Sequence, residues 1–418
     1  MSMFYERNLP DGVNLSGFLS SEKGLGEGAR SMGRAMKAAQ IPYVLNDFVD
    51  RGSKNAEGGS LEFSSVNPYN VNLVCVHADA FFPFLKSKGE DYFKDKINIG
   101  HWAWELEEFP VLWHSHFSYF DEIWAPSRFT LDALSRVSPI PVVRIPYCLS
   151  EDFFKEPPEK NQGRERFGFS SSDFIFLFAF DLASVFERKN PIGLLRAFRK
   201  AFPPGRKKKA ALVLKILRAG DFPRQFQEIE REAHGLNVKI ITEVLSREDL
   251  ISLMASADCY ASLHRSEGFG LTLLEAMALG KPVVATGYSG NLDFMNPANS
   301  LLVGYRLSTI EKESWPYFKG ASWAEPDLEQ AAHWMRLLAR RPLWAREIGL
   351  RARADVLKLY SPQAVGRLIS ERLSRLKAER SPREKLRQNA AVKKAQLKNL
   401  WRRLENKLKR LKRPLRNK

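Results

Sequence analysis

The chain has 418 residues, of which 44% are hydrophobic and 27% are charged, values typical of a globular protein with two domains. The formal net charge is +17, but residues 371–418 alone hold 19 Lys or Arg and 4 Glu, so the remaining 46 basic and 44 acidic residues nearly cancel. This distribution excludes general nucleic-acid binding by the body of the chain, and we expect no nucleic-acid partner.

No secretory signal pattern opens the chain, and the longest apolar run, residues 174–180, is too short to span a bilayer. Cys75, Cys148 and Cys259 are odd in number and lie in apolar runs, which is typical of buried, reduced thiols rather than of a disulfide framework or a metal site. We therefore predict a cytoplasmic protein.

Apolar runs that alternate with helical patterns predict a first Rossmann-like domain over residues 1–147. Ser127 is the expected N-cap of a helix over residues 128–136. The expected strands are residues 13–18, 41–48, 71–77, 96–101, 121–126 and 142–146.

A glycine-rich segment with Gly24 and Gly26 follows the first expected strand and precedes a helix. Amides at such a helix start can bind a phosphate, although a plain tight turn gives the same pattern. Asp47 and Asp50 follow at the spacing of a nicotinamide-binding fold, so an oxidoreductase is a distant alternative.

Polar and aromatic residues mark the end of the strand at residues 96–101. His101, Trp102, Trp104 and Glu105 fall where a parallel strand gives way to its carboxyl-end loop, the edge at which open α/β sheets bind ligands. The tryptophans suit stacking on an acceptor sugar, and core packing is the alternative. Glu105 could bind an acceptor hydroxyl or act as a base.

Residues 148–165 are polar and proline-containing, and we interpret them as a linker to a second Rossmann-like domain over residues 166–360. After its first strand, Arg188 and Lys189 precede a helix, where a cationic pair can hold a diphosphate; an ordinary surface pair is the alternative. The expected strands there are residues 173–180, 212–217 and 238–241.

The stretch 259–304 is the most informative part of the sequence. A strand leads into Glu267, Gly268 and Gly270, a helix bearing Glu275 follows, and Gly280-Lys281-Pro282 leads into a second strand. The loop and helix start suit a phosphate, and the two carboxylates suit sugar hydroxyls. Together they indicate a sugar-nucleotide site.

Residues 262–304 closely resemble the donor signature of glycosyltransferase family 4, a retaining family with the GT-B fold, in which two Rossmann-like α/β domains face each other across a cleft. More loosely, the resemblance covers most of the chain. It implies that Glu275 holds the nucleotide ribose and that Glu267 lies near the donor sugar and the reacting carbon. It also implies that backbone amides bind the sugar and the diphosphate, namely those of Phe269, Gly270 and Leu271.

The same resemblance implies further donor contacts. Lys189 matches the family's phosphate-binding lysine. The family's arginine position holds Phe180-Asp181 instead, so Arg188 or Lys215 would take its place. The resemblance also places a histidine on the donor sugar, with His101 the first candidate and His77 the second. His264 would line the crevice, with Gly24 and Gly26 across from the diphosphate.

The sequence contains no Asp-x-Asp pair, so we expect no metal and no cofactor besides the nucleotide-sugar substrate. Helix amides and cations would stabilise the leaving diphosphate. No residue is placed as a covalent nucleophile, and the resemblance implies front-face substitution with retention.

Residues 361–380 are expected to form a closing helix that crosses back to the first domain, and residues 381–418 a basic helical tail. Within residues 383–418 the leucines repeat at three and four, which suits an anionic membrane surface, a partner helix or, less well, nucleic acid. The apolar positions are Leu397, Leu400, Leu404, Leu408, Leu411 and Leu415.

We therefore predict a hexosyltransferase that acts on a glycan or lipid-linked acceptor in cell-surface polysaccharide or glycoconjugate assembly, peripheral on the inner face of the membrane. One alternative is a degenerate glycan-assembly subunit that docks through the tail. The other is a GT-B epimerase that acts on the sugar nucleotide itself.

Overall fold

The computed structural model describes residues 9–53, 55, 57, 59, 61–204 and 210–379. The chain divides into two compact units, residues 1–367 and residues 368–418, and both sheets lie in the first unit. The basic tail predicted over residues 381–418 lies outside the described residues.

The first sheet has six parallel strands in the order β2-β1-β3-β4-β5-β6, and it confirms the six strands expected in this part of the chain. Successive strands are added on one side of β1 up to β2 and on its other side from β3 onward, so the reversal point of this sheet lies between β1 and β3. The strands are β1 Val13–Gly17, β2 Tyr43–Asp47, β3 Val71–Cys75, β4 Ile97–His101, β5 Glu122–Ala125 and β6 Val142–Arg144. The helices are α1 Gly24–Ala38, η1 Ala78–Ala80, α2 Phe81–Lys88, η2 Glu90–Phe93, η3 Val111–Tyr119, α3 Arg128–Ser135 and η4 Glu151–Phe154.

The second sheet also has six parallel strands, in the order β12-β11-β10-β7-β8-β9, with its reversal between β7 and β10. The strands are β7 Phe174–Asp181, β8 Ala210–Leu217, β9 Val238–Ile241, β10 Cys259–Ser262, β11 Val283–Thr286 and β12 Leu301–Val303. The helices and turns are α4 Lys160–Arg166, η5 Leu182–Ser184, α5 Phe186–Lys189, α6 Pro191–Ala201, η6 Ala219–Asp221, α7 Pro223–Ala233, α8 Arg247–Ser256, α9 Leu271–Ala278, η7 Gly290–Asp293, α10 Leu328–Arg340 and α11 Pro342–Leu359.

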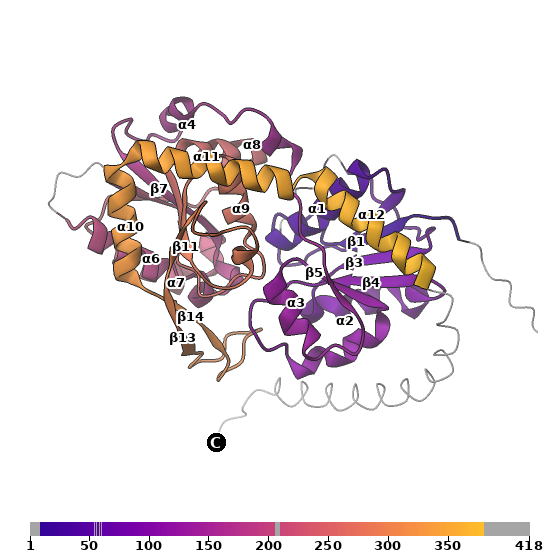
Figure 1. Cartoon of the computed structure of the whole chain (residues 1–418). Coiled ribbons are helices and arrows are strands. Elements are labelled where there is room, and N and C mark those ends of the chain that lie inside the picture. Colours follow the sequence, from indigo (N-terminus) through magenta and orange to yellow (C-terminus); the bar gives the residue numbers. More distant parts are fainter. Residues whose placement is uncertain are drawn as a thin grey trace, which may run out of the picture. The chain divides into compact units, whose positions relative to one another are not determined.

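These strands form because their apolar runs are covered on both faces, as parallel sheets require. In β7 seven successive residues, 174–180, are buried. On the second sheet α10 packs against α6 and α11 against α9 (Figure 1). Ser127 accepts a hydrogen bond from the Thr130 amide, so it caps α3 as the sequence predicted.

The segment expected to be a linker is not a plain loop, because residues 160–166 form helix α4. Arg164 pairs with Asp258 at 2.5 Å, and its Nε donates to the Ser256 carbonyl at 3.2 Å. Asp258 also accepts the amide of Ile175 in β7. This buried pairing with a distant segment holds a short helix whose interior contains Gly163, a residue with low helix propensity.

Residues 305–326 form an excursion, a segment that leaves the second sheet between β12 and α10. Its strands were not predicted from the sequence. β13 (Tyr305–Thr309) and β14 (Ser322–Pro326) pair antiparallel as a separate two-stranded sheet. The last described helix, α12 (Pro362–Glu379), begins against α1, since an ideal Cβ on Gly366 would lie 2.4 Å from the Ala35 carbonyl oxygen.

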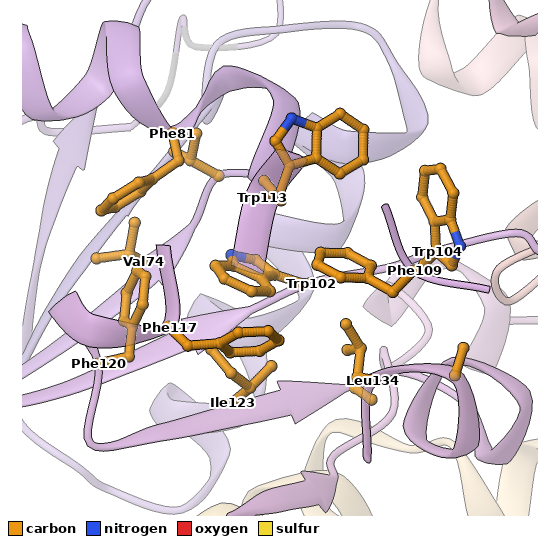
Figure 2. Packing of buried hydrophobic residues seen from close by; sticks show 14 of the residues in the cluster. Val74, Phe81, Trp102, Trp104, Phe109, Trp113, Phe117, Phe120, Ile123 and Leu134 are labelled. Carbon is orange, nitrogen blue, oxygen red and sulfur yellow. The ribbon is translucent and has the colours of Figure 1, made fainter. Parts of the chain in front are cut away.

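An aromatic core fills one face of the first sheet. Trp102 and Trp104, which the sequence offered as acceptor contacts, are 0% and 4% exposed (Figure 2). Trp102 stacks on Phe109 at 5.9 Å and meets Phe117 at 5.3 Å. The Trp102 ring therefore has no free face on which a sugar could stack. The expected acceptor role of Trp102 is wrong, and the residue packs in the core instead.

The three cysteines are free and buried, as the sequence predicted. Burial raises the pKa of the Cys75 and Cys259 thiols, and that of Cys148 to about 11. Among the described helices, none is both long and apolar enough to cross a membrane.

Candidate functional site

The reversal point of the second sheet gathers three charged residues at the carboxyl ends of β7 and β10. Arg188 and Lys189 belong to α5, which follows β7, and Glu267 follows β10. Lys189 Nζ lies 2.5 Å from Glu267 Oε1, and Arg188 Nη1 lies 3.2 Å from Glu267 Oε2. Ligands of open α/β sheets bind at such reversal points. Three of the four residues predicted to be catalytic therefore share one location, and His101 lies elsewhere, on the first sheet.

The charges in this cluster support one another. Burial alone would raise the pKa of Glu267, but Lys189 and Arg188 outweigh it and lower that pKa to about 2. Burial lowers the pKa of Lys189, against the attraction of Glu267. The carboxylate is therefore firmly ionised between its two cations.

Arg188 was one of two candidates for the role of the family arginine, and it lies in this cluster. Its guanidinium donates to the carbonyls of Ser266 at 2.8 Å and Ser184 at 3.0 Å. Its buried Nε has no hydrogen-bond partner among the described residues. A buried donor without a partner is costly, so this atom suits a ligand oxygen.

Lys215 does not join this cluster. Within the described residues, its Nζ donates only to the Ile216 carbonyl, at 3.5 Å, and the acids that act on it are Glu243 and Asp181. Burial lowers its pKa to about 8. Of the two cations weighed from the sequence, Arg188 is therefore the one that reaches Glu267.

Glu275, on α9, is 5% exposed and pairs with Arg247 Nη2 at 2.9 Å. Burial raises its pKa, against the attraction of Arg247. Arg247 also attracts Glu27 of α1. Burial alone would raise the pKa of Glu27, but Arg34, Arg247 and Arg30 outweigh burial and lower that pKa to about 2. A charge network therefore links the glycine-segment helix to the predicted ribose carboxylate.

The loop before α9 lies directly against the first domain. Ser127 Oγ donates to the Gly268 carbonyl at 2.6 Å, and an ideal Cβ on Gly268 would lie 3.2 Å from Ala103 Cβ. Gly270 has a φ of +96° at the N-cap of α9, where side chains are disfavoured. A side chain at Gly268 would therefore crowd the first domain, and Gly270 provides the left-handed backbone that starts α9.

The other residues of the predicted glycine loops are also near one another. An ideal Cβ on Gly24 would lie 4.0 Å from Leu271 Cδ1, so the two loops approach. Gly26 fits tightly under the Ser21 carbonyl and serves the turn itself. The Phe269 ring is buried against Tyr147 at 5.2 Å, which leaves only its backbone for a ligand.

The histidines differ in what they offer. His101 is 1% exposed, its Nε2 lies 3.0 Å from the Ile145 carbonyl oxygen, and burial lowers its pKa to about 4. Its buried Nδ1 has no partner in the described structure. His264 is held between Ser262 and Asn291, each at 3.1 Å, and is a satisfied core residue.

His77 and Glu105 are half-buried and attract each other. Burial lowers the pKa of His77, against the attraction of Asp79 and Glu105. Glu105 also acts on Arg188 and Lys189. Of the two histidines weighed from the sequence, His77 is therefore the more accessible.

Sequence reasoning missed Arg247 and Tyr317. Arg247 follows Ser246, which caps α8, and Tyr317 lies in the 305–326 excursion with its ring 5.6 Å from Trp104. Neither belongs to a recognisable motif, so no local signal could have found them. Within the described ranges, no group of three or more His, Cys, Asp or Glu residues is arranged to hold a metal ion.

Comparison with known proteins agrees with this geometry. Residues 160–306 match the family model described as glycosyl transferases group 1, a segment that contains the second sheet, Glu267 and Glu275. A search of curated protein sequences found no match. The family match supports a glycosyltransferase.

Solved structures extend the likeness to the whole fold. HepE of Anabaena, in complex with UDP and glucose, is 16% identical with a TM-score of 0.62, over 87% of this chain and 100% of that one. Sucrose-phosphate synthase of Thermosynechococcus elongatus is 16% identical with a TM-score of 0.61, over 88% and 100%. WaaG, a glycosyltransferase involved in lipopolysaccharide biosynthesis, is 16% identical with a TM-score of 0.54, over 86% and 99%. The two-domain α/β GT-B fold is thereby confirmed.

The charged cluster makes stability depend on pH. Because the folded-state pKa of Glu267 lies near 2, below its ordinary value of 4.5, its ionised form stabilises the fold above about pH 5, and this contribution is lost as the pH falls toward 2. Between pH 5 and pH 3 we expect the wild-type protein to lose about 2 kcal/mol more than Glu267→Gln.

Urea unfolding at a series of pH values measures this difference. Glu27, which has a similarly lowered pKa, titrates in both proteins and cancels in the comparison. Parallel pH dependences of the two proteins would show that Glu267 is not held by its cations.

Proposed function

We propose that this protein is a retaining, metal-independent glycosyltransferase that moves a hexose from a nucleotide-diphosphate sugar to a glycan or lipid-linked acceptor. The observation that carries the proposal is the Glu267–Lys189–Arg188 cluster at the reversal point of the sheet, inside the segment that matches glycosyl transferases group 1. The resemblance to glycosyltransferase family 4 supports retention, since that family is retaining.

The residues divide the work of binding the donor. Lys189 and Arg188 supply positive charge for the diphosphate, and the unpartnered Nε of Arg188 supplies a further donor. The amides of Gly270 and Leu271 stand at the start of α9, where the helix favours an anion. As the bond to the sugar breaks, these groups stabilise the charge that grows on the leaving diphosphate.

Two carboxylates bind the rest of the donor. Glu275 accepts the ribose hydroxyls and exchanges part of its contact with Arg247 for them. Glu267 orients the donor sugar while its cations turn toward the phosphates. No side chain is required as a nucleophile, because the acceptor attacks from the face that the diphosphate leaves.

UDP is the first nucleotide to test as part of the donor, because HepE of Anabaena was solved with UDP and with UDP-glucose. WaaG is involved in lipopolysaccharide biosynthesis, which supports a role in cell-surface glycan assembly. We place the protein in the cytoplasm, peripheral on the inner membrane face.

A glycan-assembly subunit with a degenerate site is the second candidate. It is favoured by the ion pairs that Glu267 already makes with both Lys189 and Arg188, and by the Phe180-Asp181 at the position of the family arginine.

A sugar-nucleotide epimerase would turn over its substrate without an acceptor, so product analysis in the absence of acceptor separates it from a transferase.

Thermal unfolding with UDP, GDP, ADP, dTDP and their glucose esters tests the proposal. A ligand present at a hundred times its Kd adds about 2.7 kcal/mol to stability, which for a chain of this length raises Tm by about 3 °C. We expect such a rise in Tm with the nucleotides of one base and not with those of the others. No shift with any of them would contradict a donor site and favour the degenerate subunit.

A further inference from the structure

The two residues that flank Glu267 in the chain are each hydrogen-bonded to the first domain. Ser266 Oγ donates to the Glu105 carbonyl, and the Gly268 carbonyl accepts from Ser127 Oγ at 2.6 Å. The bonded residues are 161 and 141 positions apart in the chain, so both bonds join the loop over residues 266–270 to the other domain. The central carboxylate of the charged cluster is therefore bracketed by two hydrogen bonds between the domains.

The Ser127 proton is directed to Gly268. A hydroxyl has one proton to donate, and Ser127 Oγ lies 2.6 Å from the Gly268 carbonyl oxygen but 3.2 Å from Thr130 Oγ1. Thr130 Oγ1 is closer to the Trp104 carbonyl, at 2.9 Å, than to that of Gly268, at 3.2 Å, so its own proton goes to Trp104. Ser127 is therefore the main donor to the Gly268 carbonyl. Its oxygen at the same time accepts from the Thr130 amide and caps α3.

The start of α3 is itself fixed against the second domain, by Asp293 of η7. The two oxygens of this carboxylate accept from the Arg128 amide at 3.1 and 3.2 Å, and one of them pairs with Arg144 Nη1 at 2.6 Å. The Asp293 side chain is only 5% exposed, so these charge-assisted bonds are shielded from water. Ser127 directly precedes Arg128, and it therefore reaches loop 266–270 from a fixed position.

Both serine hydroxyls depend on the contact between the domains. Ser127 and Ser266 are each 0% exposed, and a buried hydroxyl needs a partner inside the protein. In each case that partner is a backbone carbonyl of the other domain. The two bonds thus form where the domains meet, and they fix the chain on either side of Glu267.

We propose that Ser127 and Ser266 are positioning residues: they hold Glu267 in register with the first domain, so that the donor sugar faces the hydroxyl of an acceptor bound there. This inference rests on the proposed glycosyltransferase function, and it adds two residues that act through loop 266–270 rather than on the donor. Transfer needs the donor and the acceptor hydroxyl in line, and a misplacement of about 1 Å can cost about 10² in rate. Two bonds at the domain boundary are therefore sufficient to control turnover.

Ser266→Ala removes the bond to Glu105, and Ser127→Ala removes the bond to Gly268. Because Ser127→Ala also removes the cap of α3, the control is Asp327→Ala, which removes the side-chain cap of α10 in the second domain.

The probe is the glucose ester of whichever nucleoside diphosphate gives the largest Tm shift, with a panel of octyl glycosides as acceptors. Turnover is followed as release of the nucleoside diphosphate. For both serine variants we expect about tenfold lower kcat, because the reacting groups lose their alignment. The Kd of the nucleoside diphosphate should stay unchanged, and Asp327→Ala should keep the wild-type kcat.

Hydrogen exchange followed by mass spectrometry gives a readout that does not depend on turnover. Residues 265–271 should exchange about tenfold faster in both serine variants than in the wild type, and at the wild-type rate in Asp327→Ala. Wild-type kcat in either serine variant, an equal loss of kcat and nucleotide affinity, or unchanged exchange of this segment would overturn the inference.

Absence of turnover by the wild-type protein with every donor would contradict the proposed function instead. In that case faster exchange of residues 265–271 in the serine variants would still support their hold on the loop, and unchanged exchange would still overturn it.

Discussion

Lys189→Met is expected to lower turnover of the nucleotide sugar by about 10² to 10³, the loss typical when one preorganised group that stabilises developing charge is removed. Lys189 Nζ lies 2.5 Å from Glu267 and is the most direct source of positive charge at the reversal point of the second sheet. Methionine keeps much of the side-chain volume, so the loss reports charge rather than packing. The effect should fall mainly on kcat, because charge grows on the diphosphate as the donor bond breaks.

The matched control is Lys200→Met. Lys200 pairs with Glu329 at 2.6 Å on the surface of the same domain, and both side chains are exposed. Since exposed ion pairs contribute little, this variant should behave as wild type. Near wild-type turnover by Lys189→Met would remove Lys189 from the donor site.

Glu275→Gln is expected to weaken nucleotide binding by about tenfold to hundredfold, which corresponds to the hydrogen bonds of one buried charged acceptor. Glutamine keeps the shape but offers one acceptor oxygen in place of two. Arg247 retains its contact with Ser150 at 3.3 Å and its attraction to Glu27, so the fold should survive the change. The loss would appear as a smaller Tm shift with nucleotide and as a higher Kd by calorimetry.

Glu329→Gln is the control for this variant, because Glu329 is an ion-paired glutamate far out on the surface of α10. It should leave nucleotide binding unchanged. If Glu275→Gln bound nucleotide as well as wild type while remaining folded, Glu275 would be a purely structural partner of Arg247. Equal losses with nucleoside and nucleoside diphosphate would support contact with the ribose rather than the phosphates.

Local sequence features predicted much of this fold. The apolar runs at residues 71–77 and 173–180 became β3 and β7, because a strand covered on both faces must be apolar throughout. Ser127 caps its helix as expected, since capping depends only on atoms a few residues apart. The order of strands and helices was sufficient to indicate two Rossmann-like sheets.

The candidate site was predictable where its residues belong to a motif next to a strand end. Glu267, Lys189 and Arg188 come from the ends of strands that are neighbours in the sheet, so parallel topology brings them together. His101, by contrast, occupies the expected place but turns its ring into the core toward Ile145. The position of His101 in the sequence therefore predicted the edge of the sheet at which it lies, but it did not predict the direction of its side chain.

The sequence by itself therefore determined the two α/β sheets, the glycine loops and the glutamates of the predicted donor motif. Only the tertiary structure decided which side chains from distant segments meet: Arg247 on Glu275, Tyr317 on Trp104, and Trp102 in the core instead of at the acceptor. The physical reason is that strand and cap formation depend on short-range periodicity and backbone hydrogen bonds. Pairing of charges and rings between distant segments depends instead on packing, which leaves no local pattern in the chain.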